Sequence, residues 1–248
     1  MADRRNSKAY WGKVAKSYDK LVSETGDKAH SLVINPIVLN FLGDLKGKIV
    51  LDAGCGNGYW SRRLAQRAKK VVGIDFTEEL IRIAESKLPS HNLEFRQGNL
   101  KELKFPDSKF DVVLCNMVLI DVDDLDKVIG ELARVLKPNG VLIASITHPC
   151  FENPPNTTTL EDKKGRKIGR LVKHYFKVGL VVDTNQNWDT QREYQHYHYM
   201  ISDYLNAFAR HGLCLIKTSE PNWVEMTGEG DYSHTPYFII WKLRKLAA

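Results

Sequence analysis

The sequence has few cysteines and no long apolar run. Four cysteines occur among 248 residues, at Cys55, Cys115, Cys150 and Cys214. They form no CxxC pair and no disulfide-like cluster, a usage that suits a reducing cytoplasm. No stretch approaches the roughly 20 apolar residues that a spanning helix needs. The opening residues, MADRRNSKAYWGK, lack the apolar core and cleavage site of a signal peptide. We therefore expect a soluble, cytoplasmic protein with no membrane partner.

Internal repeats and low-complexity tracts are also missing. Hydrophobic residues make up 43% of the chain, enough for a real core, and 248 residues fit one α/β domain over residues 1–248. The net charge is +6 and the pI about 9.0. Lys and Arg occur in scattered short pairs. This balance is compatible with RNA or an acidic partner, but solubility alone also explains it.

Strand-like and helix-like segments alternate through the first half of the chain. The predicted strands are Lys48–Ala53, Lys70–Asp75, Leu93–Arg96, Phe110–Cys115 and Gly140–Ile146. The predicted helices between them are Tyr59–Ala68, a helix opening at Thr77, and Asp124–Leu136. This alternation is typical of an α/β fold with a parallel sheet covered on both faces.

Two regions flank this core. Helices are expected at Ser7–Leu21 and His30–Phe41, within residues 1–45. After the fifth strand, residues 151–198 are polar, with one strand-like piece at Tyr175–Val182. So long an excursion in a compact domain is typical of a lid or binding insertion. A helix at Tyr199–His211 and strands at Leu213–Thr218 and Tyr237–Leu243 are expected to complete the chain.

The most informative segment reads VLDAGCGNG, residues 50–58. An apolar run leads into Gly54, Gly56 and Gly58 at alternate positions. Glycine suits turns with unusual dihedral angles and places where backbone must approach a ligand closely. A dinucleotide-binding fingerprint, G-x-G-x-x-G, would need a glycine at position 59, where the chain has Tyr59. The pattern is instead D-x-G-x-G-x-G.

This motif resembles the first motif of the class I S-adenosylmethionine (SAM)-dependent methyltransferases. Other family motifs follow in order: Asp75, 17 residues beyond Gly58; Gly98-Asn99-Leu100 after the third strand; and Asn116-Met117 after the fourth. The resemblance implies a Rossmann-like, doubly wound, seven-stranded sheet with its last strand antiparallel. It also implies N-terminal helices, an insertion after strand five, and SAM as cofactor, with S-adenosylhomocysteine (SAH) as product.

The resemblance implies a set of cofactor-binding residues. Asp75 would accept the ribose hydroxyls, since one carboxylate takes two hydrogen bonds. Asn99, where the family often has Asp, would accept from the adenine amino group. The full set is Trp11, Tyr18, Asp52, Gly54, Cys55, Gly56, Asn57, Gly58, Trp60, Asp75, Phe76, Gly98, Asn99, Leu100, Asn116 and Met117.

Methyl transfer from a sulfonium is an in-line displacement, so positioning does most of the work and a base is optional. His148 follows the fifth strand, at the sheet edge where ligands of open α/β sheets bind. A later Tyr197-His198 and Glu220-Pro221 complete a resemblance to small-molecule methyltransferases. We take His148 and His198 as candidate catalytic residues. Residues 1–45 would form a lid over the SAM pocket, and residues 151–198 a cap on the acceptor site.

The acceptor itself stays open. A small molecule with a nitrogen or oxygen nucleophile is the first hypothesis; RNA methylation and a non-catalytic SAM-binding subunit are the alternatives. Asn116-Met117-Val118-Leu119 lacks the Pro-Pro motif of enzymes that methylate exocyclic base amines. The histidine-rich stretch Trp188–Met200 could line an acceptor pocket, but it has no zinc-ligand spacing. Cys55, Cys115 and Cys150 at strand ends leave metal or arsenic chemistry as a minor alternative; we expect no metal. Sequence leaves the oligomeric state undetermined.

Overall fold

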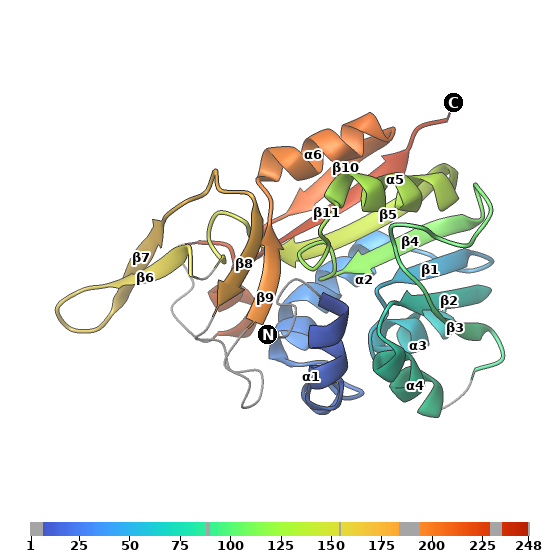
Figure 1. The fold of residues 1–248 in the computed structure, drawn as a ribbon, viewed down its shortest axis with the longest axis horizontal. Coiled ribbons are helices and arrows are strands. Elements are labelled where there is room, and N and C mark those ends of the chain that lie inside the picture. The colour runs from blue at the N-terminus through green and yellow to red at the C-terminus, as the bar shows by residue number, and fades with distance from the viewer. Residues whose placement is uncertain (1–6, 88–89, 154, 184–193, 229–234, 248) are drawn as a thin grey trace.

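A seven-stranded sheet runs through the middle of the molecule (Figure 1). The computed structural model describes residues 7–87, 90–153, 155–183, 194–228 and 235–247. The sheet contains β1 (Ile49–Ala53), β2 (Lys70–Asp75), β3 (Leu93–Gln97), β4 (Phe110–Asn116), β5 (Leu136–Thr147), β10 (Leu213–Ser219) and β11 (Phe238–Lys245). Their order is β10-β11-β5-β4-β1-β2-β3, and β11 is antiparallel to both of its neighbours. The predicted fold class is confirmed.

Helices cover both faces of this sheet. They are α1 (Ser7–Val22), the π-helical turn η1 (His30–Ile34), α2 (Asn35–Leu42), α3 (Tyr59–Ala65), α4 (Glu78–Ser86), α5 (Leu125–Val135), α6 (Ile201–Arg210) and α7 (Trp223–Thr227). Consecutive residues of β1 point to opposite faces. Leu51 joins the core cluster under α5 and α6, and Val50 joins the cluster under α2 and α3. Apart from Asp52 the strand is apolar, because neither face meets water.

Several expected boundaries were wrong. β5 begins at Leu136 rather than Gly140, because Leu136 pairs with Phe110 across an irregularity in the β4–β5 ladder. The expected single helix His30–Phe41 is divided into η1 and α2, with a proline in the first turn of α2. Proline lacks an N–H to donate back to the preceding turn, so a helix readily starts there.

The segment after β5 holds four strands rather than the one expected at Tyr175–Val182. They are β6 (Thr157–Glu161), β7 (Lys167–Val172), β8 (Gly179–Asp183) and β9 (Tyr194–His198). β6 pairs with β7, and β8 with β9, as two small antiparallel sheets. Sequence pattern missed β6 and β7 because most of their side chains are not buried, so no apolar face marks them. Of the stretch 188–200, residues 188–193 lie outside the described residues, and 194–198 form β9.

The β6–β7 hairpin extends away from the body of the molecule (Figure 1). It lies beyond the end of the sheet at which β4 and β5 finish, on the side opposite β3 and α4. Among the residues that the structure describes, none of the helices combines the length and apolar character needed to cross a bilayer.

Candidate functional site

A cavity of about 700 Å³ opens at the carboxyl edge of the sheet, beside α1. Parallel strands that end together gather their following loops at one edge, which is where open α/β sheets bind ligands. Eleven of the expected cofactor-binding residues lie in its wall: Trp11, Tyr18, Gly54, Gly56, Asp75, Phe76, Gly98, Asn99, Leu100, Asn116 and Met117. The structure therefore brings together segments from 11 to 117 that are far apart in the sequence.

The glycine loop after β1 has no room for a side chain at Gly54 and little room for one at Gly56. Gly54 has φ +75° and Gly56 φ +52°. A Cβ on Gly54 would lie 2.4 Å from a methyl carbon of Val118, and one on Gly56 would lie 3.3 Å from the Tyr18 ring. The Gly54 N–H donates to the Ile74 carbonyl at 2.8 Å, which ties the loop to the end of β2. These glycines leave a cradle of bare backbone beside the cavity.

Asp75 ends β2 and is buried in the cavity wall. Its Oδ2 accepts from the Gly56 N–H at 3.0 Å, and its Oδ1 from the Thr77 N–H at 2.8 Å. Burial raises the pKa of this carboxyl, and the two backbone donors oppose the shift. A carboxylate offers about four acceptor sites, so these two bonds fix its orientation and leave capacity for ligand hydroxyls.

Five expected cofactor residues stand behind the wall instead of in it: Asp52, Cys55, Asn57, Gly58 and Trp60. Asp52 accepts from the Ser61 hydroxyl at 2.6 Å. Burial, together with the charge of Asp75, raises the pKa of Asp52 to about 7. Asn57 donates to Asp19 of α1 at 2.8 Å. Trp60 is 4% exposed and belongs to the core cluster under α2 and α3.

Helix α1 closes one side of the cavity. Trp11 and Tyr18, seven residues apart, lie on one helix face with their rings edge to face at 5.3 Å. Asp19, one residue further, pairs with Lys87 after α4 and accepts from Asn57 beside the glycine loop. The helix is thus fastened at the cavity by polar contacts to two separate segments.

Sequence reasoning missed Asp121, which lines the cavity near Trp11. In the described part of the chain, its Oδ1 is buried without a hydrogen-bond partner. Burial raises the pKa of Asp121 well above its usual range, and a hydrogen bond from the Trp11 side chain opposes this. Such a group in a cleft is a candidate for function. The acidic run at Asp121, Asp123 and Asp124, just after the fourth strand's loop, was the available signal.

Other wall residues were also missed, among them Lys8, Leu80 and Ile120, whereas Tyr197 belongs to the stretch 188–200 that the sequence suggested as a pocket lining. Tyr197 belongs to β9, and its N–H donates to the Ile120 carbonyl at 2.6 Å. That bond joins the segment after β5 to the loop after β4. The long excursion therefore contributes directly to the cavity, although the contributing residue lies next to His198 rather than being the histidine itself.

Neither candidate catalytic histidine lies in the cavity wall. His148 is buried, its Nε2 donates to Glu220 at 2.9 Å, and its Nδ1 accepts from the Cys150 N–H at 3.2 Å. Burial lowers the pKa of His148, while Glu220 opposes the shift. His198 accepts from the Asn153 amide at 2.8 Å and donates to the Tyr175 carbonyl at 2.7 Å. Protein groups occupy both nitrogens of each ring, so contact with an acceptor stays a prediction.

Two of the cysteines at strand ends lie in surroundings that disfavour thiol reactivity. Cys55 and Cys115 are buried, and burial raises the pKa of both thiols, which disfavours the nucleophilic thiolate. Within the described ranges, no group of three or more His, Cys, Asp or Glu side chains is placed to hold a metal ion.

Comparison with known proteins gives the same assignment as the motifs. Residues 51–144 match the family model described as "Methyltransferase domain". The chain is 36% identical over 145 residues to a demethylmenaquinone methyltransferase of Lactococcus lactis, covering 56% of this chain and 57% of that protein. A demethylmenaquinone methyltransferase of Bacillus licheniformis is 36% identical over 135 residues, covering 53% and 58%. The match thus spans just under three fifths of these curated relatives.

Solved structures share the fold over most of the chain. A putative SAM-dependent methyltransferase from Listeria monocytogenes superposes with a TM-score of 0.73 at 25% identity, covering 86% of this chain and 97% of that one. A SAM-dependent methyltransferase from Mesorhizobium loti gives 0.73 at 23% identity, covering 87% and 97%. Residues 51–144 are therefore a methyltransferase domain, in a chain with the fold of the class I SAM-dependent methyltransferases, whose cofactor is S-adenosylmethionine.

Proposed function

We propose that this chain transfers the methyl group of SAM to a small-molecule acceptor bound in the same cavity, through a nitrogen or oxygen nucleophile. The supporting observation is that two sets of residues line one cavity. The first set is the bare backbone of the glycine loop together with Asp75. The second set is Trp11, Asp121 and Tyr197. A volume of about 700 Å³ lies within the range of small-molecule sites.

The first set of residues fits an adenosyl ligand. Asp75 is oriented by backbone donors and keeps acceptor capacity for ribose hydroxyls. Phe76 and Leu100 offer apolar surface for adenine, and Asn99 lies beside them. Gly54 and Gly56 present bare backbone to the cavity, and a Cβ at either position would press against Val118 or Tyr18. Bound SAM would supply a methyl group made electrophilic by its sulfonium.

In the second set, we assign Asp121 the role of general base, which takes the proton of the acceptor's nucleophile. A carboxylate whose pKa is raised by burial is a stronger base than an exposed one. As the nucleophile bonds to the methyl carbon, its proton would pass to Asp121, and the methyl–sulfur electron pair would leave with SAH. Trp11 and Ile120 would exclude water around this group.

Two segments would enclose the site, residues 1–45 as a lid and residues 151–198 as a cap. Support for the lid comes from Trp11 and Tyr18 in the cavity wall. Support for the cap comes from Tyr197, which is hydrogen-bonded to Ile120. Since the curated relatives are demethylmenaquinone methyltransferases, an acceptor panel should begin with quinones and their hydroxyl forms, followed by small amines.

Calorimetric titration with SAM and SAH, with NAD as control, tests the cofactor half. Micromolar binding of both adenosyl ligands and none of NAD is expected. Failure of both to bind would overturn the proposal.

The acceptor is tested by measuring SAH release across the panel, with an RNA fraction as comparator. Turnover on RNA alone, or binding with no turnover on any acceptor, would count against a small-molecule enzyme.

The variant Asp121→Asn distinguishes a role in catalysis from a role in cofactor binding. If Asp121 takes the acceptor's proton, kcat falls by about 100-fold or more, while the SAH dissociation constant stays within threefold. A large loss of SAH affinity with unchanged kcat would instead assign Asp121 to cofactor binding. Asp126→Asn, at an exposed acid on α5 that pairs with Arg210 away from the cavity wall, is the matched control and should change neither quantity appreciably.

A further inference from the structure

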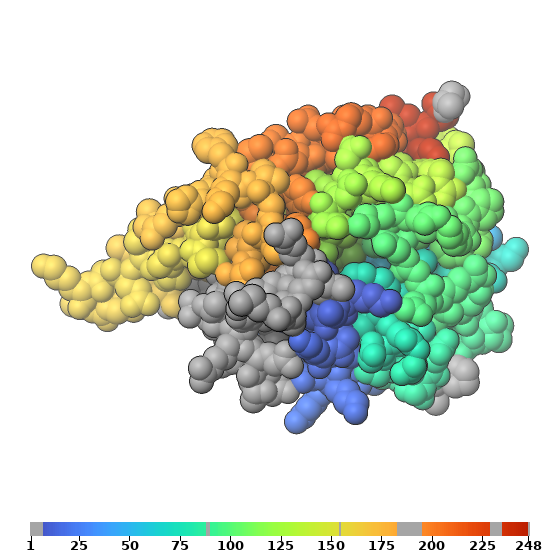
Figure 2. All heavy atoms as spheres, viewed as in Figure 1, coloured from blue at the N-terminus to red at the C-terminus, as the bar shows by residue number. Residues whose placement is uncertain are grey.

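The net positive charge of the chain arises mostly from one segment. We define the arm as residues 157–178, comprising β6, β7 and the loop that follows them. It contains seven Lys and Arg against two Asp and Glu, a net +5 of the chain's +6. The sequence alone suggested scattered pairs. The β6–β7 hairpin, which carries five of these seven basic residues, projects from the body of the molecule (Figure 2).

The same arm exposes apolar side chains. Twelve large hydrophobic residues are exposed in the part of the chain that the structure describes, and six belong to these 22 residues. They are Leu160, Ile168, Leu171, Val172, Phe176 and Val178. Scattered single exposed hydrophobics are ordinary, but a concentration of this kind marks an interaction surface.

Strand register separates an inner from an outer face of the hairpin. Thr159 is paired with Arg170, and Arg170 reaches Glu152 at 2.6 Å, so this face is held to the body. Leu171 of β7 is opposite Thr158 of β6, and Leu160 lies two residues after Thr158 on β6. Because side chains alternate along a strand, Leu160 and Leu171 share the other face, away from that ion pair.

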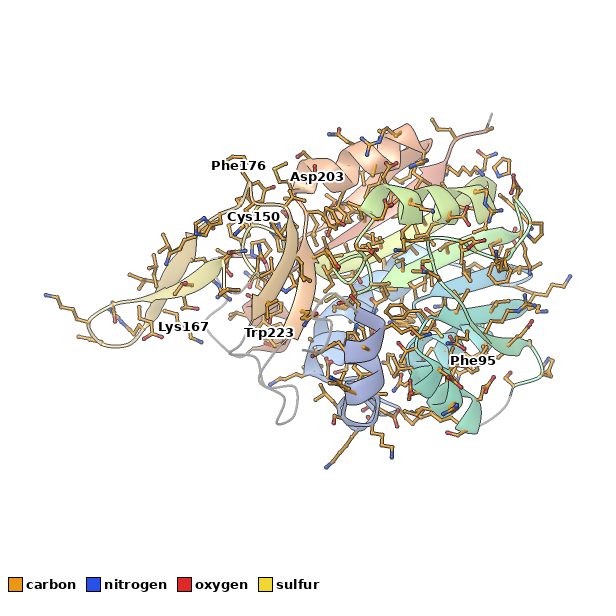
Figure 3. All side chains as sticks on the ribbon, in the orientation of Figure 1. Phe95, Cys150, Lys167, Phe176, Asp203 and Trp223 are labelled. Carbon is orange, nitrogen blue, oxygen red and sulfur yellow. The ribbon has the colours of Figure 1, made fainter. Side chains whose placement is uncertain are left out.

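The loop after β7 presents its apolar residue in a fixed way. The Tyr175 hydroxyl accepts from the Ile201 N–H at 3.0 Å, and its carbonyl accepts from His198 at 2.7 Å. With Tyr175 anchored, the adjacent Phe176 is 84% exposed and flanked by Lys177. In Figure 3, Phe176 lies at the outer margin of the molecule, and Lys167 lies on the hairpin.

We propose that the arm binds the surface of an anionic phospholipid bilayer. Interfacial membrane binding combines apolar side chains that enter the headgroup boundary with Lys or Arg that meet anionic lipid. The arm offers both on one projection, and its lysine stems can bury while the ammonium groups stay in water. This contact is peripheral and needs no spanning helix, and it replaces the expectation from the sequence that the chain has no membrane partner. It also does not depend on the proposed enzymatic function.

Composition distinguishes this partner from two others. Five of the seven basic residues are Lys, a residue depleted from protein interfaces, whereas Arg is enriched there. The two arginines already pair within the chain, Arg166 with Asp162 and Arg170 with Glu152. Single-stranded RNA sites use aromatic stacking platforms, while five of the arm's six exposed apolar residues are aliphatic. A bilayer is the partner that uses lysine and aliphatic side chains together.

Flotation of the full chain with vesicles tests the proposal, comparing phosphatidylglycerol-containing vesicles with pure phosphatidylcholine at low and physiological salt. Binding to the anionic vesicles, weakened by salt, is expected. Each basic residue near an anionic surface is worth about fivefold in partitioning, so Lys163→Gln/Lys164→Gln should weaken binding about 25-fold. Phe176→Ser should weaken it about tenfold or more through lost apolar transfer.

Matched controls lie outside the arm. Lys46→Gln/Lys48→Gln removes two exposed lysines before β1, and Leu246→Ser removes an exposed apolar residue near the C-terminus. Both should bind vesicles as the wild type does. Thermal melting confirms that each variant is folded. No vesicle binding by the wild type, equal loss in arm and control variants, or an arm that binds RNA but not vesicles would each overturn the proposal.

Discussion

Asp75 is the residue on which the cofactor assignment most directly depends. Asp75→Ala removes a buried carboxylate in the cavity wall that accepts from two backbone donors. We expect SAH binding to weaken by about 1–3 kcal/mol, through lost hydrogen bonds to the ligand. Isothermal titration measures it. Glu85→Ala, an exposed acid on the adjoining α4, is the control. Unchanged affinity in Asp75→Ala would remove this residue from the cofactor site.

Asp52 should make the stability of the folded protein decrease as the pH rises. Its pKa is about 7 in the folded chain, against an ordinary value of 3.8, mainly because it is buried. The folded state therefore holds this proton more tightly than the unfolded state does. The resulting stabilisation is complete below pH 3.8 and is lost as the pH rises through about 7.

Asp52→Asn should therefore flatten the stability profile. An Asn at this position can still accept from the Ser61 hydroxyl, and it cannot ionise. We expect the ligand-free wild type to lose more stability between pH 5 and 8 than the variant loses. Calorimetric melting at pH 5, 6, 7 and 8 measures the difference. Equal slopes for the two proteins would show that Asp52 does not titrate in this range.

Among the elements, the loop between β1 and α3 has the strictest steric requirement. Gly54→Ala would place its Cβ 2.4 Å from Val118 at φ +75°. Gly47→Ala has nearly the same φ, +74°, with no heavy atom within 4 Å. The control thus isolates the backbone strain, about 1 kcal/mol for an alanine in the left-handed region. We expect Gly54→Ala to lower SAH affinity more than tenfold and Gly47→Ala to leave it unchanged.

The double variant Gly54→Ala/Val118→Ala tests the steric explanation. Removing the two Val118 methyl groups relieves the contacts at 2.4 and 2.8 Å, but it keeps the Val118 Cβ at 3.1 Å and the strained φ. Affinity should therefore recover in part, measured by the same titration. If SAH affinity did not recover, the loss would come from the backbone conformation of the loop. If it recovered fully, the positive φ at position 54 would be unimportant for binding.

How well the elements could be predicted depends on burial. β1 and β2 were predicted to within a residue, since both faces of these strands are covered and the apolar runs are continuous. β6 and β7 gave no signal because they bury almost nothing. Wall residues carried by a motif, such as Gly54, were found. Asp121 was not, because its importance arises from burial beside Trp11, which only the fold creates.

The whole molecule divides its two proposed roles between different parts. The cavity is built from α1 and from loops at the carboxyl edge of the main sheet, with Tyr197 of β9 in its wall. β6 and β7 pair with each other in a sheet of their own. Excluding the arm, the net charge of the chain is only +1. Electrostatic attraction to an anionic surface should thus act on the arm rather than on the body.

This separation predicts that the arm's tip can be removed without harm to the site. Replacing residues 161–168 by Asn-Gly would close the hairpin at the Leu160–Gly169 pair with a two-residue turn. The Arg170–Glu152 ion pair that holds the arm would remain. We expect a change in thermal midpoint of no more than about 2–4 °C, the shift caused by about 1 kcal/mol in a chain of this size. SAH affinity should stay within twofold while vesicle binding is lost. A loss of SAH affinity in a variant that still melts cooperatively would show instead that the arm supports the cavity, and that the two parts work as one unit.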